Sequence, residues 1–252
     1  MRLSKLLFLG LLFSTLTSCS NYSQVTSGKA YLEHHQIKTD KARDGSISKD
    51  FNKRLVDAAN VEPTISFPAR IGLARIENGR VTSIPTDEME VWSKLSEKLG
   101  SKFGEFVPLS VLVSKMISDN SDSAMEQIRL GSARQHFDAV LVYEVSDKVS
   151  RESNLLSLGD LTIIGGFIFP SKELKSDVIV AAMLVDVMSG YPYGQASNSA
   201  SKEDLSSSFG ANANREKLSA QTKVLGVEKL ADDVNDMMQS LRAELGQKKS
   251  KK

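Results

Sequence analysis

The chain has 252 residues, of which 40% are hydrophobic and 25% are charged, and its formal net charge at pH 7 is +1. This length can bury one good core, or one core with a small appendage, and the composition is that of an ordinary globular protein. The balance of 32 Lys and Arg against 31 Asp and Glu argues against a strongly basic protein, so we expect no nucleic-acid partner.

The first eighteen residues have the pattern of a secretory signal peptide. Arg2 and Lys5 supply a cationic start, and an apolar run covers residues 6–13. That run is well short of the roughly 20 residues that a membrane-spanning helix needs. The segment could be an ordinary secretory signal or a short membrane segment, and the residues at its end favour a third possibility.

A cysteine closes this segment, after the residues Leu16, Thr17 and Ser18, and Cys19 is the only cysteine of the chain. The tetrapeptide resembles the lipobox of bacterial lipoproteins. The resemblance implies that the thiol of Cys19 carries a diacylglycerol, that the peptide is cut before Cys19, and that the new amino group is acylated. Each lipid CH2 that enters the bilayer contributes about 0.8 kcal/mol, so several acyl chains make a lasting anchor.

Ser20 follows the cysteine, and by the sorting rule of that family this residue implies the outer membrane of a Gram-negative envelope, with the folded part facing the periplasm. Removal of the signal with Arg2 and Lys5 leaves 30 Lys and Arg against 31 Asp and Glu, so the mature chain is close to neutral. With its only thiol acylated, the mature protein has no disulfide and depends on packing for its stability.

Residues 19–50 are polar and carry no sustained hydrophobic period, which indicates a tether between the lipid and the folded part. His34 and His35 lie in this stretch. Because His136 is the only other histidine and no acidic or cysteine ligand stands at a suitable spacing, we interpret the pair as solvated residues. The sequence therefore predicts no metal site and no cofactor.

A single periplasmic domain is expected over residues 51–246, and its first part alternates helices and strands. The predicted order is helix, strand, helix, edge strand, short helix, helix and strand, over 48–59, 69–76, 86–99, 106–109, 111–116, 121–137 and 137–145. Phe51 and Leu55 share one side of the first helix. Asn78-Gly79 marks a turn, Thr86 is a candidate helix cap, and Gly100 ends the third element.

The second part begins with a long strand at 175–188, a turn at Ser189-Gly190 and a returning strand at 191–197. Residues 198–214 are predicted to form a loop, 216–245 a long amphipathic helix, and 247–252 a basic tail. The predicted fold class is therefore α/β (α+β), with a mixed sheet, a late antiparallel hairpin, helices packed on the sheet and a long C-terminal amphipathic helix.

The segment between these parts is apolar and rich in glycine. It could pack as core strands, or it could contact a membrane or a partner protein, and Asp160 makes it too polar for a spanning helix. The candidate contact residues are Leu155, Leu156, Leu158, Ile163, Ile164, Phe167, Ile168 and Phe169.

Catalytic motifs are missing from the sequence. It contains no Gly-x-Ser-x-Gly elbow, no Gly-x-Gly-x-x-Gly and no phosphate loop. The carboxylates that flank or enter strands are candidates for acid–base work, although acidic residues at strand ends are common; they are Asp138, Glu144, Asp177 and Asp186. We predict no catalytic residue.

A second resemblance concerns layout, over residues 69–200. The segments 70–74, 138–142 and 181–190, the last with its Val-Asp-Val turn, are arranged as in several envelope proteins. These are the periplasmic domain of the curli secretion-channel lipoprotein, the lipoprotein activators of penicillin-binding proteins, and the amino-terminal domain of the Tol system's periplasmic protein. The resemblance implies a scaffold or regulator rather than an enzyme, and it transfers no functional residue.

The sequence thus predicts a non-enzymatic envelope lipoprotein that binds another envelope protein or itself. One alternative is a pore or secretion-assembly subunit that inserts residues 155–169 into a membrane. Another is an envelope hydrolase whose site the sequence does not reveal.

Overall fold

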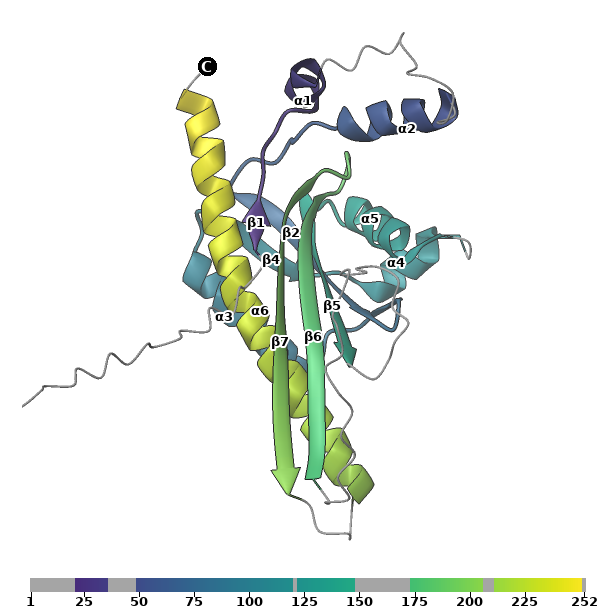
Figure 1. Ribbon diagram of the computed structural model, residues 1–252, viewed down its shortest axis with the longest axis vertical. Coiled ribbons are helices and arrows are strands. Elements are labelled where there is room, and N and C mark those ends of the chain that lie inside the picture. Colours follow the sequence, from purple (N-terminus) through teal and green to yellow (C-terminus); the bar gives the residue numbers. More distant parts are fainter. Residues whose placement is uncertain (1–20, 36–48, 120–121, 148–172, 206–210, 251–252) are drawn as a thin grey trace, which may run out of the picture.

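The computed structural model describes residues 21–35, 49–119, 122–147, 173–205 and 211–250. In these residues the chain forms one seven-stranded sheet in the order β1-β7-β6-β5-β2-β3, with β4 also paired to β2 (Figure 1). The strands are β1 Tyr22–Ser23, β2 Ala69–Glu77, β3 Arg80–Thr82, β4 Gly104–Pro108, β5 Ala139–Asp147, β6 Glu173–Asp186 and β7 Pro192–Leu205. The helices are α1 Gly28–His34, α2 Lys49–Ala59, α3 Thr86–Leu99, α4 Val111–Ile117, α5 Ala124–Arg134 and α6 Ala211–Ser250.

The sheet is mixed, as the sequence predicted. Strand β2 pairs in parallel with β4 and β5, whereas β6 runs antiparallel to both of its neighbours, β5 and β7. The helices between β2 and β5 make the parallel crossover possible, and the turn after Asp186 makes the late hairpin. The predicted α/β class is confirmed.

Alternating side chains of β5 fill two separate cores. Leu141 and Tyr143 belong to the larger core on one face, and Val140 and Val142 belong to the smaller core on the other. Both sets are buried, which confirms the prediction of a strand covered on both sides. Residues of α3 and α6 complete the larger core, and Ile128 of α5 lies in the smaller one.

Helix α6 lies along β6 and β7 on the face opposite α4 and α5 (Figure 1). Apolar residues at helical spacing, among them Val227, Val234 and Leu241, are fully buried against the sheet. Gly226 permits a close approach, because a Cβ at this position would lie 3.0 Å from side-chain atoms of Val178 and Val180. The long C-terminal helix is therefore confirmed, and it extends to residue 250, through part of the predicted basic tail.

The N-terminal residues differ from the prediction of a polar tether. Tyr22 and Ser23 pair with Gln195 and Gly194 as an edge strand, and a helix follows at Gly28–His34. The tether hypothesis is wrong for residues 21–35, because backbone pairing with a distant strand needs no hydrophobic period in the sequence. His34 and His35 lie at the end of α1, where the ring of His35 lies 4.2 Å from that of Tyr31.

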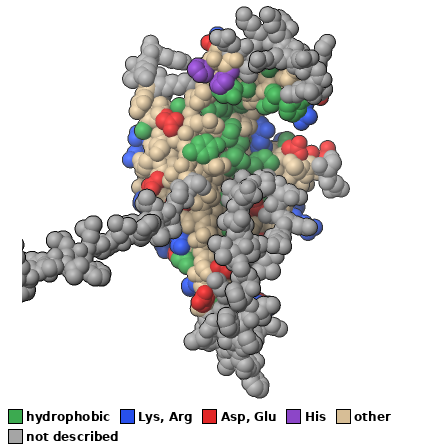
Figure 2. All heavy atoms as spheres, in the orientation of Figure 1, with side chains coloured by type: hydrophobic (Ala, Val, Ile, Leu, Met, Phe, Trp, Pro, Cys, Tyr) green, Lys and Arg blue, Asp and Glu red, His purple; other side chains and the backbone are tan. Residues whose placement is uncertain are grey.

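Two local predictions also need correction. Strand β7 continues to Leu205, where a loop was expected from residue 198. Pro85, not Thr86, occupies the N-cap of α3, and it makes no side-chain capping bond. In α2, Phe51 and Leu55 are 44% and 50% exposed, and Figure 2 shows hydrophobic side chains on the outer surface at the position of this helix.

Asn78 and Gly79 form the predicted turn between β2 and β3, with φ angles of 51° and 71°. Positive φ at both central residues is what a tight hairpin of this handedness requires, and Asn-Gly satisfies it at little steric cost. Among the described residues, no helix combines the length and apolar character needed to cross a bilayer.

Candidate functional site

The residues that the sequence singled out for contact with lipid or a partner lie outside the described residues. These are Cys19 and the eight apolar residues between Leu155 and Phe169. Their roles stay predictions.

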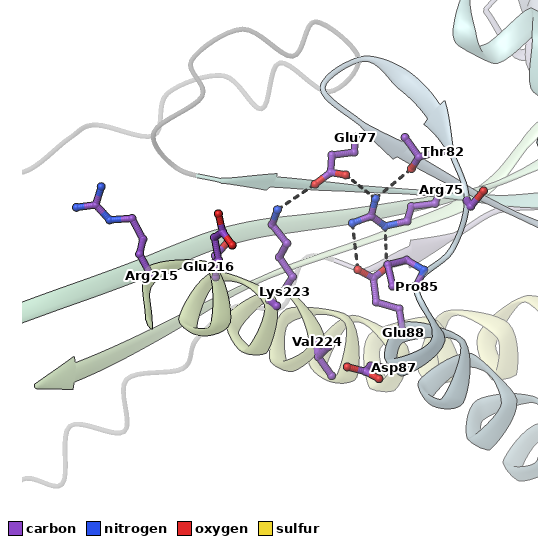
Figure 3. A pocket seen from close by; sticks show the side chains of 13 residues that line it. Arg75, Glu77, Thr82, Pro85, Asp87, Glu88, Arg215, Glu216, Lys223 and Val224 are labelled. Atoms are coloured by element: carbon purple, nitrogen blue, oxygen red, sulfur yellow. Dashed lines mark hydrogen bonds and ion pairs between the residues drawn. The ribbon is translucent and has the colours of Figure 1, made fainter. Parts of the chain in front are cut away.

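A hollow of about 610 Å³ lies where the β2–β3 hairpin meets the start of α3 and the first half of α6. Charged and hydroxyl side chains line much of it (Figure 3), and the sequence analysis did not single it out. They include Arg75, Glu77, Thr82, Asp87, Glu88, Arg215, Glu216 and Lys223.

Arg75 makes four hydrogen bonds in the wall of this hollow, and the residue is only 3% exposed. Its guanidinium donates Nε–H to Glu88 at 2.8 Å and Nη2–H to the other carboxylate oxygen of Glu88 at 3.1 Å. Its Nη1 donates to Glu77 at 2.8 Å and to the hydroxyl of Thr82 at 3.0 Å. This forked geometry fits the planar guanidinium, and it satisfies a cation that would otherwise be costly to bury.

Two further donors complete the cluster. The hydroxyl of Tyr143 donates to Glu88 at 2.8 Å, and the ammonium of Lys223 donates to Glu77 at 2.9 Å. Arg75, Glu77, Glu88, Tyr143 and Lys223 are named the ionic cluster below. Its two cations and two carboxylates cancel in charge.

Hydrogen bonding and burial shift the titration of this cluster. Burial disfavours the charged form of Arg75, but the bonds to Glu88 and Glu77 outweigh it and raise the pKa of Arg75 above its ordinary value. The bond from Arg75 lowers the pKa of Glu77. Burial, together with the charge of Glu88, raises the pKa of Tyr143. Arg75 and Glu77 are therefore charged, and Tyr143 is neutral, at neutral pH.

The ionic cluster is suited to holding elements together. It joins β2 and β5 to α3 and α6, and each of its carboxylates already accepts hydrogen bonds from two side chains. The remaining charged residues of the hollow, Asp87, Arg215 and Glu216, are exposed. No nucleophile held by a base is present in the described lining of the hollow.

A second buried polar cluster surrounds Asp186, at the end of β6. Its carboxylate accepts hydrogen bonds from the hydroxyl of Thr64, from the hydroxyl of Tyr193 at 2.7 Å, and from the backbone N–H groups of Met188 and Ser189 at 3.0 and 2.7 Å. The hydroxyl of Tyr193 in turn accepts from the backbone N–H groups of Thr64 and Ile65. Asp186, Thr64 and Tyr193 are named the aspartate cluster below.

The aspartate cluster has its own pattern of pKa shifts. Burial alone would raise the pKa of Asp186, but the bonds from Thr64, Ser189 and Tyr193 outweigh burial and hold this pKa below its usual range. Burial and the bond to Asp186 raise the pKa of Tyr193 to about 12. Asp186 is therefore an anion that shapes the Val-Asp-Val turn.

The four strand-end carboxylates considered for acid–base work lie in different surroundings and do not form one site. Asp138 is exposed and accepts from the backbone N–H of Arg70 at 2.7 Å, and Asp186 belongs to the aspartate cluster. Glu144 is 7% exposed, and its Oε1 has no hydrogen-bond partner among the residues that the structure describes. Asp177 is half-buried near the start of β6. The ionic cluster was missed because Arg75 resembles an ordinary basic residue of a half-buried strand.

Comparisons with known proteins come from structure alone, since no protein-family model and no curated protein matches the sequence. Lipoprotein GNA1162 from Neisseria meningitidis is 16% identical, with 61% of this chain and 97% of that chain covered and a TM-score of 0.31. Hypothetical protein CT253 from Chlamydia trachomatis is 12% identical, with 69% and 99% covered and a TM-score of 0.33.

A third similar structure is the PelC dodecamer from Paraburkholderia phytofirmans, which is 12% identical, with 62% of this chain and 84% of that chain covered and a TM-score of 0.26. At these identities and TM-scores, the similarities do not define a function for this chain.

Proposed function

We propose that this chain is a lipid-anchored protein of a bacterial cell envelope that binds or scaffolds another envelope protein, or a second copy of itself, and catalyses no reaction. The anchor is the acylated Cys19. The domain faces the periplasm from the outer membrane.

The observation that carries this proposal is the tetrapeptide of Leu16, Thr17, Ser18 and Cys19 after a short cationic and apolar segment. A secretory signal places the mature chain outside the cytoplasm, and a cysteine at the processing site supplies the thiol for acylation. Two or more acyl chains on one residue give a stable anchor, whereas a single chain gives only marginal binding.

The two polar clusters support a non-catalytic role. Glu88 and Asp186 are 2% and 1% exposed, and each is surrounded by donors that fix neighbouring elements. A general base needs a free lone pair directed at a substrate proton. These two carboxylates instead use their lone pairs inside the fold.

Metabolic labelling with an alkyne fatty acid tests the anchor. We expect label on the wild-type chain, loss of label in Cys19→Ser, and release of that variant from the membrane fraction. A Ser18→Ala variant keeps a small residue before the cysteine and is the matched control, so it should stay labelled. Retention of Cys19→Ser in the membrane would contradict the anchor.

Crosslinking in intact cells tests the scaffold. We expect a discrete covalent adduct that contains either a second copy of this chain or one other envelope protein, identified by mass spectrometry of its peptides. Only monomer at every crosslinker length would contradict the binding role. Turnover of an envelope substrate by the purified protein would contradict the non-catalytic role.

A further inference from the structure

The first described residues of the chain are built into the edge of the sheet. Tyr22 and Ser23 pair with Gln195 and Gly194 of β7. Directly after them, Gln24 donates its backbone N–H to the carbonyl of Tyr193 at 2.8 Å, and its side-chain amide donates to the carbonyl of Pro192 at 2.8 Å. The pairing thus continues beyond the two residues of the strand.

Side chains fasten the same stretch to α6 and β7. Ser23 donates its hydroxyl to Glu244, and Asn21 donates its amide to the carbonyl of Asp233 at 3.5 Å. The glycine at position 194 allows β1 to lie close to β7, because a Cβ on this residue would lie only 2.5 Å from the carbonyl oxygen of Tyr22. Residues 21–24 are therefore held by partners that lie far along the chain.

Chain length then limits the distance to the anchor. Three residue steps separate Cys19 from Tyr22, and a fully extended chain spans at most about 3.6 Å per residue, or about 11 Å in total. A free tether over residues 19–50 could have spanned about 100 Å. The paired strand removes that reach, because the sheet begins almost at the acylation site.

We infer that the domain lies directly against the bilayer, with the sheet edge of β1 and the adjoining stripe of α6 facing the lipid headgroups. This inference rests on the proposed function, because it needs the lipid on Cys19. Tyr22 is 44% exposed at this edge, and an aromatic side chain with a polar tip suits a membrane–water interface.

The stripe of α6 follows from the contacts of its residues. Lys229 donates to the carbonyl of Ser199 at 3.2 Å, Asp233 and Glu244 contact Asn21 and Ser23, and these α6 positions recur at helical spacing. Asp233 is only 7% exposed, so the exposed residues of the stripe are the ones that face outward. Ser240 lies on the same stripe, seven residues after Asp233 and four before Glu244, and it is exposed. Met116, a residue of α4, is 83% exposed. Helix α4 lies on the opposite side of the sheet from α6 (Figure 1).

Spin labelling tests this orientation. Acylation consumes the thiol of Cys19, so Ser240→Cys and Met116→Cys each give the full-length protein one free thiol for a nitroxide. The labelled lipoproteins are reconstituted in phosphatidylcholine vesicles, with or without a lipid whose headgroup chelates Ni²⁺. We expect the Ni²⁺ lipid to enhance relaxation at residue 240 several-fold more than at residue 116.

A linker variant separates anchoring from orientation. Twenty Gly and Ser residues inserted between Ser20 and Asn21 give a flexible spacer of about 25 Å, which should abolish the difference between the two labels. Mass spectrometry of the same samples shows whether Cys19 carries lipid, and so distinguishes a failure of the orientation from a failure of the anchor. Equal relaxation at both sites with lipid present on Cys19 overturns this inference alone. Absence of lipid on Cys19 overturns the proposed function as well.

Discussion

The ionic cluster and the aspartate cluster bury carboxylates in different ways. In the ionic cluster, Glu88 faces the guanidinium of Arg75, and opposite charges pair inside the fold. In the aspartate cluster, Asp186 is a lone anion held by hydroxyl and amide donors. Both carboxylates have more than one donor, as buried charges require.

The two clusters also fasten different parts of the molecule. The ionic cluster joins β2 and β5 to the helices α3 and α6. The aspartate cluster joins the β6–β7 hairpin to residues 64 and 65, through the hydroxyl of Tyr193. The backbone carbonyl of the same tyrosine accepts a hydrogen bond from Gln24, which follows the N-terminal strand. The ionic cluster therefore stabilises the packing of the helices on the sheet, and the aspartate cluster orders the hairpin that pairs with the N-terminal strand.

The largest expected effect comes from breaking the ionic cluster. Glu88→Gln leaves Arg75 buried without its principal counter-charge, which should lower the free energy of unfolding by about 3–5 kcal/mol. Urea denaturation of the purified protein measures it. The neighbouring Asp87 is exposed, so Asp87→Asn should lose less than about 1 kcal/mol. Equal losses in the two variants would show that the cluster is not the cause.

Asp186→Asn tests the lone anion. The NH2 group of the new asparagine would face groups that are themselves hydrogen-bond donors. We therefore expect the free energy of unfolding to fall by about 2–3 kcal/mol at pH 7. Because the folded pKa of Asp186 is lowered, its contribution is present above the unfolded pKa near 4 and is lost as pH falls through the folded pKa. The difference from wild type should therefore shrink below about pH 4. Asp57→Asn, on the exposed surface of α2, is the control and should change little.

Tyr193→Phe tests the neutral partner of that anion. We expect a loss of about 1–2 kcal/mol at pH 8 from the missing hydrogen bonds. The folded pKa is raised to about 12 from an ordinary 10, so the stabilisation by the neutral phenol is complete below pH 10 and is lost as pH rises through 12. The gap between wild type and variant should close over that window in denaturant titrations. A gap that stays constant to pH 12 would contradict this account.

The smallest effect is expected at the rim of the ionic cluster. The side chains of Lys223 and Glu77 are 20% and 28% exposed, so water screens their pair. Lys223→Met keeps the aliphatic stem and should change the free energy of unfolding by less than about 1 kcal/mol. A loss comparable to that of Glu88→Gln would mean that the two carboxylates act as one unit.

Much of the fold could be predicted because its signals are local. The apolar runs of β5 and β6, the Asn78-Gly79 turn and the periodic α6 each carry their pattern within a short stretch. The β7 residues 198–205 belong to a stretch, 198–214, that is rich in Ser, Ala and Asn, and this composition is typical of a loop. In the structure Ala200 lies in the larger core, and the side chain of Asn198 donates a hydrogen bond to Asp233 of α6 at 2.7 Å.

The rest depends on distant contacts. Tyr22 pairs with a strand more than 170 positions away along the chain, and no local period marks a two-residue edge strand. The ionic cluster combines Arg75, Glu88 and Tyr143 from three elements, so its members looked like unrelated polar residues until the fold placed them together.

Peptide mass spectrometry of the protein extracted from the membranes of its native host tests the central claim most directly. The account predicts an N-terminal peptide that begins at Cys19 and carries a thioether-linked diacylglycerol together with an N-acyl chain. A peptide with a free thiol at residue 19, or one whose N-terminus lies elsewhere, would contradict it.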